Sequence, residues 1–195
     1  KDIPKGSKFV KEKVGFTDLN FGYYKVNTKK IYLLDLVDPS YPFNVSDFVK
    51  VAIPTVNYIS SNKKLPIVVG GTGFYIKALT DGIETLNIPP NEKLRKELED
   101  LSSDALFDIL KKENPQRACN MNQSDRRNKR RLIRAIEISR SMRKNEEILK
   151  LKNYDILIIG LEAEREEIKK RIDTRVEKRL EQGAINEAKN LFKNY

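Results

Sequence analysis

The chain has 195 residues, which is enough for one full domain or one and a half. Lys and Arg number 38 against 28 Asp and Glu, a net charge of +10, and the composition is that of a folded chain. No apolar run approaches the roughly 20 residues of a membrane-spanning helix. Histidine is absent and Cys119 is the single cysteine, which excludes Ser-His-Asp or Cys-His catalysis, multi-Cys zinc sites and intrachain disulfides. We therefore expect a cytoplasmic protein without a membrane segment.

The first half of the chain alternates between predicted strands and helices. Residues 31–37 form a near-continuous apolar run, typical of a strand buried on both faces, and helical spacing follows from 48 to 59. Residues 66–69 predict a second buried strand, which leads directly through Gly70–Gly73 into a helix over 74–79. This order favours an α/β fold with a parallel sheet.

The second half is mainly helical. Residues 91–142 predict helices only, residues 154–161 return to the strand pattern, and helices follow over 164–182 and 185–194 with Gly183 as the stop between them. The plan is therefore an α/β sheet interrupted by a helical insertion. The predicted domains are 1–86, the first part of the α/β core; 87–150, the helical insertion; and 151–195, the return to the core with the C-terminal helices.

The Gly70–Gly73 segment is the first candidate site. Glycines at the end of a strand let backbone N–H groups approach a ligand, and the following helix N-terminus favours an anion. The hydroxyl of Thr72 could donate to a phosphate. Ligands bind at the carboxyl ends of parallel strands, although a tight turn that only packs helix on strand is the alternative. The segment is neither a P-loop nor the dinucleotide G-x-G-x-x-G motif.

The basic segment 125–144 is the second candidate site. It carries nine Lys and Arg against Asp125 and Glu137, which accounts for +7 of the net charge. Arg outnumbers Lys in it, and Arg suits bidentate contacts with phosphate. A solvated helix face is the alternative, but the unbalanced charge favours binding of a polyanion, above all nucleic acid. The candidate contacts are Arg127, Arg130, Arg131 and Arg134.

Three weaker candidates remain. Arg171 and Arg175 on the 164–182 helix could clamp a diphosphate, or they could belong to a salt-bridged surface helix. Asp35, placed near the end of a predicted buried strand, is a candidate general base or metal ligand, and Asp38 is the alternative. Either residue could instead only cap a loop. Cys119 is expected to be a small buried hydrophobe.

These segments, in this order, resemble the tRNA dimethylallyltransferase (tRNA isopentenyl-transferase) family. The most specific stretches are 65–75, similar to L-P-I-[LV]-V-G-G-T-G-[LF]-Y, and 128–137, similar to D-x-x-R-[IL]-x-R-A-[LI]-E. Residues 31–48 are similar to H-H-L-[IL]-D-x-x-[DS]-P followed by F-[ST]-V-x-[DE]-[FY]. Residues 171–183 are similar to R-[IV]-x-x-R-[VF]-x-x-[ML]-x-x-x-G.

The resemblance implies a P-loop-NTPase-like parallel sheet whose helical insertion grips the anticodon stem-loop of a tRNA. It implies transfer of a dimethylallyl group from dimethylallyl diphosphate to N6 of the adenosine beside the anticodon, with Mg²⁺ assisting and the base flipped out of its stack. The four candidate arginines of 125–144 would then contact tRNA. The implied substrate-binding residues are Gly70, Gly71, Thr72, Gly73, Tyr75, Arg171 and Arg175.

The chain also departs from the family pattern. The family's G-x-T-[AG]-[ST]-G-K-[ST] loop and its D-S-x-Q-[VI]-Y segment, which holds the presumed general-base Asp, have no counterpart here. We therefore assign no catalytic residue and no metal ligand within the chain. We expect an internal fragment or a degenerate relative, monomeric and inactive alone. A non-catalytic RNA-binding module is the alternative function, and a nucleotide kinase of similar α/β plan is a third.

Overall fold

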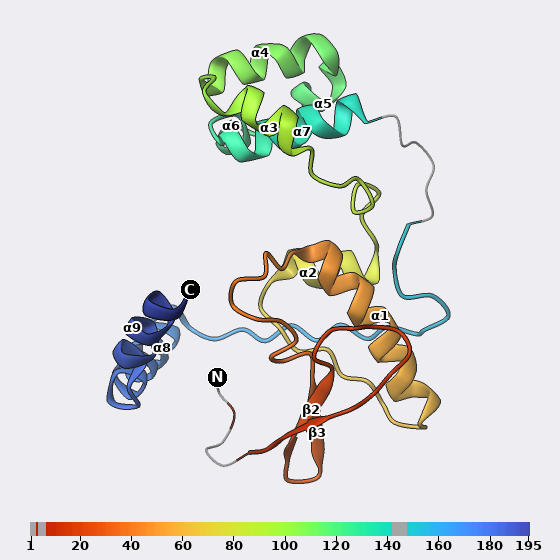
Figure 1. Cartoon of the computed structure of the whole chain (residues 1–195), viewed down its shortest axis with the longest axis vertical. Helices are drawn as coiled ribbons and strands as arrows, with labels where there is room; N and C mark the ends of the chain where they lie inside the picture. Colours follow the sequence, from red (N-terminus) through yellow and green to blue (C-terminus); the bar gives the residue numbers. More distant parts are fainter. Residues whose placement is uncertain (1–2, 4–6, 142–147) are drawn as a thin grey trace. The chain divides into compact units, whose positions relative to one another are not determined.

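The computed structural model describes residues 3, 7–141 and 148–195. The described residues form a short sheet and a series of helices (Figure 1). Contacts divide the chain into two compact units, one of Lys1–Phe43 with Lys152–Tyr195 and one of Asn44–Leu151. The elements are β1 (Phe9–Lys11), β2 (Gly22–Val26), β3 (Lys29–Tyr32), α1 (Val45–Ser61), α2 (Gly73–Thr80), α3 (Glu92–Glu99), α4 (Ser103–Glu113), α5 (Pro115–Cys119), α6 (Gln123–Arg126), α7 (Lys129–Arg140), α8 (Arg165–Glu181) and α9 (Ala184–Asn194).

The sheet is a three-stranded antiparallel meander in the order β1-β2-β3. Its last strand takes up only the beginning of the strand predicted over 31–37, because β3 ends at Tyr32. Leu33 and Asp35 have positive φ angles of 62° and 54°, and this left-handed backbone breaks the extended conformation that a strand needs. The prediction of a buried strand over 31–37 was therefore wrong: only its first two residues belong to a strand, and Ile31 is exposed there.

The strands predicted at 66–69 and 154–161 are not paired in the structure. Both segments lie outside regular secondary structure, and their apolar side chains are open to solvent: Ile67 is 75% exposed, Val69 89% and Leu157 84%. A strand is held by the hydrogen bonds of a neighbouring strand, and the described residues supply no such neighbour to either segment. The described part of the chain is thus mainly helical with a small antiparallel sheet, and the predicted parallel sheet is not formed in it.

The α3–α7 bundle, residues 92–140, forms as predicted from its helical pattern. Each of its five helices begins after a side chain that accepts a hydrogen bond from the first turn, which satisfies a backbone N–H that would otherwise lack a partner. These caps are Asn91, Ser102, Asn114, Asn122 and Asn128. The apolar faces then meet in one core, made by Leu94, Leu98, Leu106, Leu110, Ala118, Met121, Leu132, Ala135 and Ile136.

A second, smaller core joins α1 and α2. Val49, Ala78 and Leu86 are its buried members, and the rings of Phe48 and Tyr75 stack beside it with centroids 5.0 Å apart. This packing fixes the orientation of α2, the helix that follows the glycine segment. The geometry of the first candidate site is therefore set by contacts between α1 and α2.

The helices predicted over 164–182 and 185–194 are confirmed as α8 and α9. Gly183 joins them with φ of 94°, a left-handed conformation that glycine adopts without steric cost. None of the described helices is both long and apolar enough to cross a lipid bilayer.

We expect Leu106→Ala to lower the free energy of unfolding by about 2–5 kcal/mol, because it opens a cavity in the α3–α7 core. Leu106 is fully buried there. The matched control is Leu65→Ala in the same compact unit, where the side chain is 81% exposed, and it should change stability by less than about 0.5 kcal/mol. Denaturant titration of both variants checks this, and equal losses would contradict the assignment of the core.

Candidate functional site

The glycine segment forms the approach to the N-terminus of α2. Thr72 is the N-cap residue, and its carbonyl accepts hydrogen bonds from the backbone N–H groups of Tyr75 and Ile76 at 2.9 and 3.3 Å. Its hydroxyl makes no capping hydrogen bond. The first-turn N–H groups of a helix carry partial positive charge, so an anion placed here is stabilised. That Thr72 and this helix terminus bind an anionic ligand stays a prediction.

Internal packing does not explain the three glycines. A Cβ atom built on Gly70, Gly71 or Gly73 would meet no atom within 4 Å among the described residues. None of the three has a positive φ angle, so the backbone does not require glycine either. The sequence left open a turn that only packs helix on strand. The described structure shows no close contact that would require glycine at these positions, so it gives this alternative no support.

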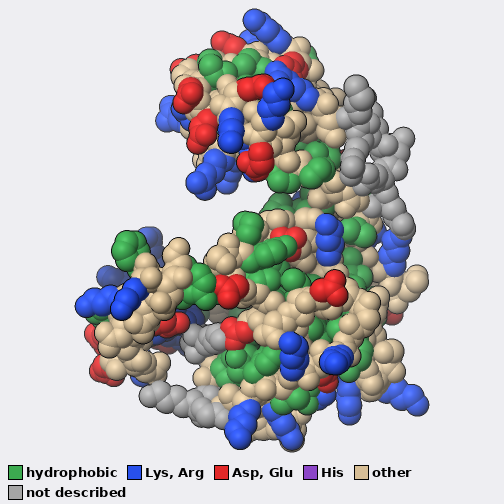
Figure 2. Space-filling model, in the orientation of Figure 1, with side chains coloured by type: hydrophobic (Ala, Val, Ile, Leu, Met, Phe, Trp, Pro, Cys, Tyr) green, Lys and Arg blue, Asp and Glu red, His purple; other side chains and the backbone are tan. Residues whose placement is uncertain are grey.

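The basic segment places its cations around the N-terminus of α7. Lys and Arg side chains stand out from the surface of the α3–α7 bundle (Figure 2). Between α6 and α7 lies an open hollow of about 790 Å³. It is lined by Gln123, Ser124, Arg127, Asn128, Lys129 and Arg130.

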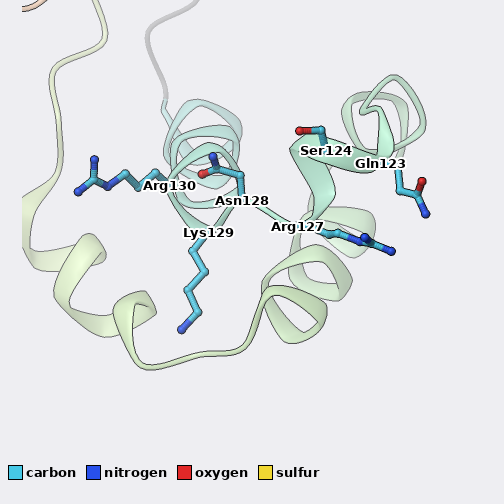
Figure 3. Close-up of a pocket in the computed structure, with 6 residues that line it drawn as sticks. All are labelled: Gln123, Ser124, Arg127, Asn128, Lys129 and Arg130. Atoms are coloured by element: carbon cyan, nitrogen blue, oxygen red, sulfur yellow. The ribbon is translucent and has the colours of Figure 1, made fainter.

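The cations of this hollow spread apart. Figure 3 shows the side chains of Arg127, Lys129 and Arg130 extending in three different directions. They therefore do not converge on one small anion. Such spacing suits several phosphates of a polyanion, which Lys and Arg contact without reading sequence.

Arg134 points to a different role, although its contact with RNA stays a prediction. Its guanidinium donates to the carboxylate of Glu137 at 2.9 Å and to the carbonyls of Thr85 and Ile88 at 3.0 and 2.7 Å. These bonds fasten the segment that leads into the bundle onto α7. Arg131 forms an ion pair with Asp125 but keeps a 58% exposed side chain, so it remains accessible beside the hollow.

Glu137 is the buried centre of this arrangement. Its side chain accepts hydrogen bonds from Arg95 at 2.7 and 3.1 Å and from the backbone N–H of Asn91 at 2.9 Å, besides the bond from Arg134. Burial alone would raise the pKa of Glu137, but the hydrogen bonds from Arg95, Asn91 and Arg134 outweigh it and hold that pKa below 4.5. The carboxylate is therefore ionised and fully hydrogen-bonded inside the bundle.

Sequence reasoning missed this network and the polar lining of the hollow. Glu137 was counted only as one of two acids that fail to balance nine cations, yet its single charge is shared by two guanidinium groups, those of Arg134 within the segment and Arg95 outside it. Gln123 and Ser124 carried one usable signal, because Asn122 followed by Asp125 is a capping pattern that places them in the first turn of α6. Two members of the basic segment, Arg143 and Lys144, lie outside the described residues.

The predicted diphosphate clamp on α8 stays a prediction. Arg171 donates to Glu167 at 2.7 Å on an exposed surface, which is the salt-bridged arrangement that the sequence left as the alternative. Arg175 lies one turn further along the same exposed helix. The Gly70–Gly73 segment belongs to one compact unit and α8 to the other.

Two expectations for single residues were wrong. Asp35 is not within a buried strand but in an exposed bend, where its carboxylate accepts a hydrogen bond from the hydroxyl of Tyr24. Cys119 is exposed, because the end of α5 turns Ala118 rather than the cysteine into the core. Asp38 accepts a hydrogen bond from Ser40 at 3.3 Å, as expected of a residue that caps a loop.

The family model and the relatives that match this chain all belong to one kind of enzyme. A family model described as IPP transferase matches residues 25–195. The tRNA dimethylallyltransferase of Finegoldia magna is 34% identical over 189 residues, covering 89% of this chain and 59% of the relative. That of Anoxybacillus flavithermus is 37% identical over 166 residues, covering 83% and 52%.

One solved structure is also similar. It is the full-length tRNA isopentenylpyrophosphate transferase from Bacillus halodurans, with 36% identity and a TM-score of 0.47, covering 82% of this chain and 50% of that one. The chain therefore spans about half to three fifths of the length of the relatives that it matches.

The buried carboxylate makes the stability of the bundle depend on pH. Because the pKa of Glu137 is lower in the folded state, its stabilising contribution is present above pH 4.5 and is lost as the pH falls toward the folded-state pKa. We expect the free energy of unfolding to decrease on acidification below pH 4.5. Glu137→Gln should remove this part of the decrease and cost about 3 kcal/mol at pH 7, since two guanidinium groups lose their counter-charge.

Glu92→Gln is the control, because Glu92 also pairs with Arg95 but has a 73% exposed side chain. It should leave the pH profile and the stability nearly unchanged. Denaturant unfolding between pH 3 and 7 measures both variants. The Glu137 network would be refuted by a Glu137→Gln profile that follows the parent curve at every pH.

Proposed function

This chain belongs to the IPP transferase family, and from this premise we propose that it is part of an enzyme that modifies tRNA. The reaction is transfer of a dimethylallyl group from dimethylallyl diphosphate to N6 of the adenosine beside the anticodon. The observation that carries the proposal is the basic hollow at the start of α7, which lies within the 25–195 family match. Several relatives are named tRNA dimethylallyltransferase.

The hollow would bind the tRNA backbone. Arg127 and Arg130 line it with exposed side chains, and the N-terminus of α7 adds the partial positive charge of its first turn. Each phosphate that such a cation neutralises releases counterions, so affinity falls as salt rises. Arg131 would add a further contact at the edge. This surface accounts for gripping the anticodon stem-loop but not for choosing the base that reacts.

The glycine segment would hold the diphosphate. In the reaction N6 attacks C1 of the dimethylallyl group, the bond from C1 to the diphosphate oxygen breaks, and N6 gives up a proton. The leaving oxygen gains negative charge, which the N–H groups at the start of α2 and the hydroxyl of Thr72 are suited to stabilise. Arg171 and Arg175 would add positive charge. The proton goes to a base that we assign to none of the described residues.

Magnesium assistance is implied by the family resemblance and stays a proposal, since Mg²⁺ is commonly held by one or two carboxylates together with substrate phosphates. No group of three or more Asp, Glu, Cys or His side chains within residues 3, 7–141 and 148–195 could hold a metal ion. The step above therefore uses only hydrogen-bond donors and cations of this chain.

The exposed apolar segments fit a P-loop-like core. We propose that 66–69 and 154–161 are strands of a parallel sheet, because pairing would bury side chains such as Val69 and Leu157. Gly70–Gly73 would then lie at the carboxyl end of a strand, where open α/β sheets bind their ligands. A cytoplasmic location and a monomeric state belong to the same proposal.

A non-catalytic RNA-binding module is the second candidate. The observation that favours it is the structure of the α3–α7 bundle, which has its own core and its own basic surface. The two functions differ in the glycine segment, because only the transferase needs it. Variants at the two sites therefore separate them.

We expect Arg127→Gln with Arg130→Gln to weaken binding of unmodified tRNA and to lower the slope of log affinity against log salt by about two. The matched control is Lys111→Gln with Lys112→Gln, which removes the same charge from the exposed end of α4. Its slope should stay close to that of the parent chain. Fluorescence anisotropy over a salt series measures both, and equal slopes for the two variants would exclude the hollow as the RNA site.

We expect Gly71→Val to leave the free energy of unfolding within about 0.5 kcal/mol of the parent, since a Cβ there meets nothing. Turnover should fall by about 100-fold or more, because the side chain occupies the space where the diphosphate approaches. Gly15→Val is the control, at another glycine with open surroundings. The assay follows label from dimethylallyl diphosphate into tRNA, with the protein as its gene encodes it. Full turnover by Gly71→Val would refute the role of the glycine segment, whereas tRNA binding without turnover in the parent protein would favour the binding module.

A further inference from the structure

The hairpin of β2 and β3 ends in a cluster of lysines. Lys25, Lys29 and Lys30 are exposed around a turn in which Asn27 adopts a left-handed φ of 53°. Figure 2 shows basic side chains at the free end of this hairpin. We call the segment Lys25–Lys30 the hairpin tip.

The tip places two like charges directly opposite each other. Lys25 and Lys30 are Cα partners in the antiparallel register of β2 and β3, so their side chains share one face of the sheet. Like charges at such a position are destabilising. A neutral or acidic residue at one of the two positions would avoid this repulsion, and a bound anion would also offset it.

The charge of Lys30 is partly balanced within the sheet. Its ammonium lies 3.3 Å from a carboxylate oxygen of Glu12 and 3.9 Å from the centre of the Tyr23 ring. Lys25 and Lys29, by contrast, have no ion pair among the residues that the structure describes. Two unbalanced cations therefore remain at the tip.

The surroundings add to this positive charge. Residues 7–32 carry six lysines and two acidic residues, Glu12 and Asp18. The family match begins only at Lys25, so β1 and most of β2 lie outside it. The tip is thus a basic surface in a different compact unit from the hollow at α7, and its lysines lie at the start of the family match.

We propose that the hairpin tip is a second RNA contact, at which Lys25 and Lys29 bind backbone phosphates. The identity of the RNA as tRNA rests on the function proposed above. Phosphates are the target because lysine offers a point charge, and because Lys30 already lies over one face of the Tyr23 ring. The contact adds affinity without reading sequence.

The test is the double variant Lys25→Gln with Lys29→Gln, which leaves the pair of Lys30 and Glu12 intact. The control removes the same charge at Lys11 and Lys13, which are exposed near the other end of the sheet. Affinity for unmodified tRNA is measured over a salt series, and thermal unfolding is followed in parallel. We expect the tip variant to lower the salt slope by about two and the control to leave it near the parent value.

The melting temperature separates binding from structure. Removing the repulsion between Lys25 and Lys30 should leave Tm unchanged or raise it while RNA binding weakens. A lowered Tm would overturn the proposal by giving the lysines a structural role, and so would a salt slope equal to the parent's. If the parent chain binds no tRNA, the proposed function fails together with this inference. If it binds and only the Arg127 and Arg130 variant loses affinity, this inference alone fails.

Discussion

The hydrogen bonds of the buried Glu137 carboxylate are the interaction on which the arrangement of the α3–α7 bundle depends. The carboxylate accepts hydrogen bonds from two guanidinium groups and from the backbone at the start of α3. Arg95 and Asn91 are 42 and 46 positions away in the sequence, and Arg134 is one helical turn away. A carboxylate without partners in this place would be costly, so the network is satisfied as a whole or not at all. It thereby fixes where the chain enters the bundle relative to α7.

The same network decides which arginines are available to a ligand. The guanidinium of Arg134 donates hydrogen bonds to Glu137 and to two backbone carbonyls, and that of Arg140 donates to Glu113. The residues just before and at the start of α7 face outward instead, because the helix begins at Lys129 and its first turn lies at the surface. Among the members of the basic segment that the structure describes, internal ion pairs thus distinguish Arg134 and Arg140 from the exposed set around the hollow.

The candidate sites differ in how they would act. The hollow and the hairpin tip offer separated cations, which suit an extended polyanion, whereas the glycine segment offers backbone donors at one helix terminus, which suit a compact one. One proposed feature, a P-loop-like sheet, would explain both the open surroundings of Gly70–Gly73 and the exposed apolar runs at 66–69 and 154–161. Covering apolar side chains such as Val69 lowers the free energy of the folded state, and the P-loop-like sheet proposed above would cover them.

The sequence by itself determined what depends on near neighbours along the chain. The helices of the α3–α7 bundle follow from caps three residues before their first-turn partners and from apolar spacing within one or two turns. The glycine segment before α2 and the glycine between α8 and α9 were likewise found from local pattern. The basic segment was recognised from its charge, although its members could not be told apart.

Tertiary structure decided what depends on distant partners. Arg134 differs from Arg130 because Thr85, 49 positions away, lies against its guanidinium. Asp35 left the predicted strand because its backbone turns left-handed, with its carboxylate bonded to Tyr24. Residues 66–69 and 154–161 are apolar, as a buried strand requires, but an apolar segment becomes a strand only when another strand pairs with it. Pairing and burial are properties of the folded arrangement, and no local pattern contains them.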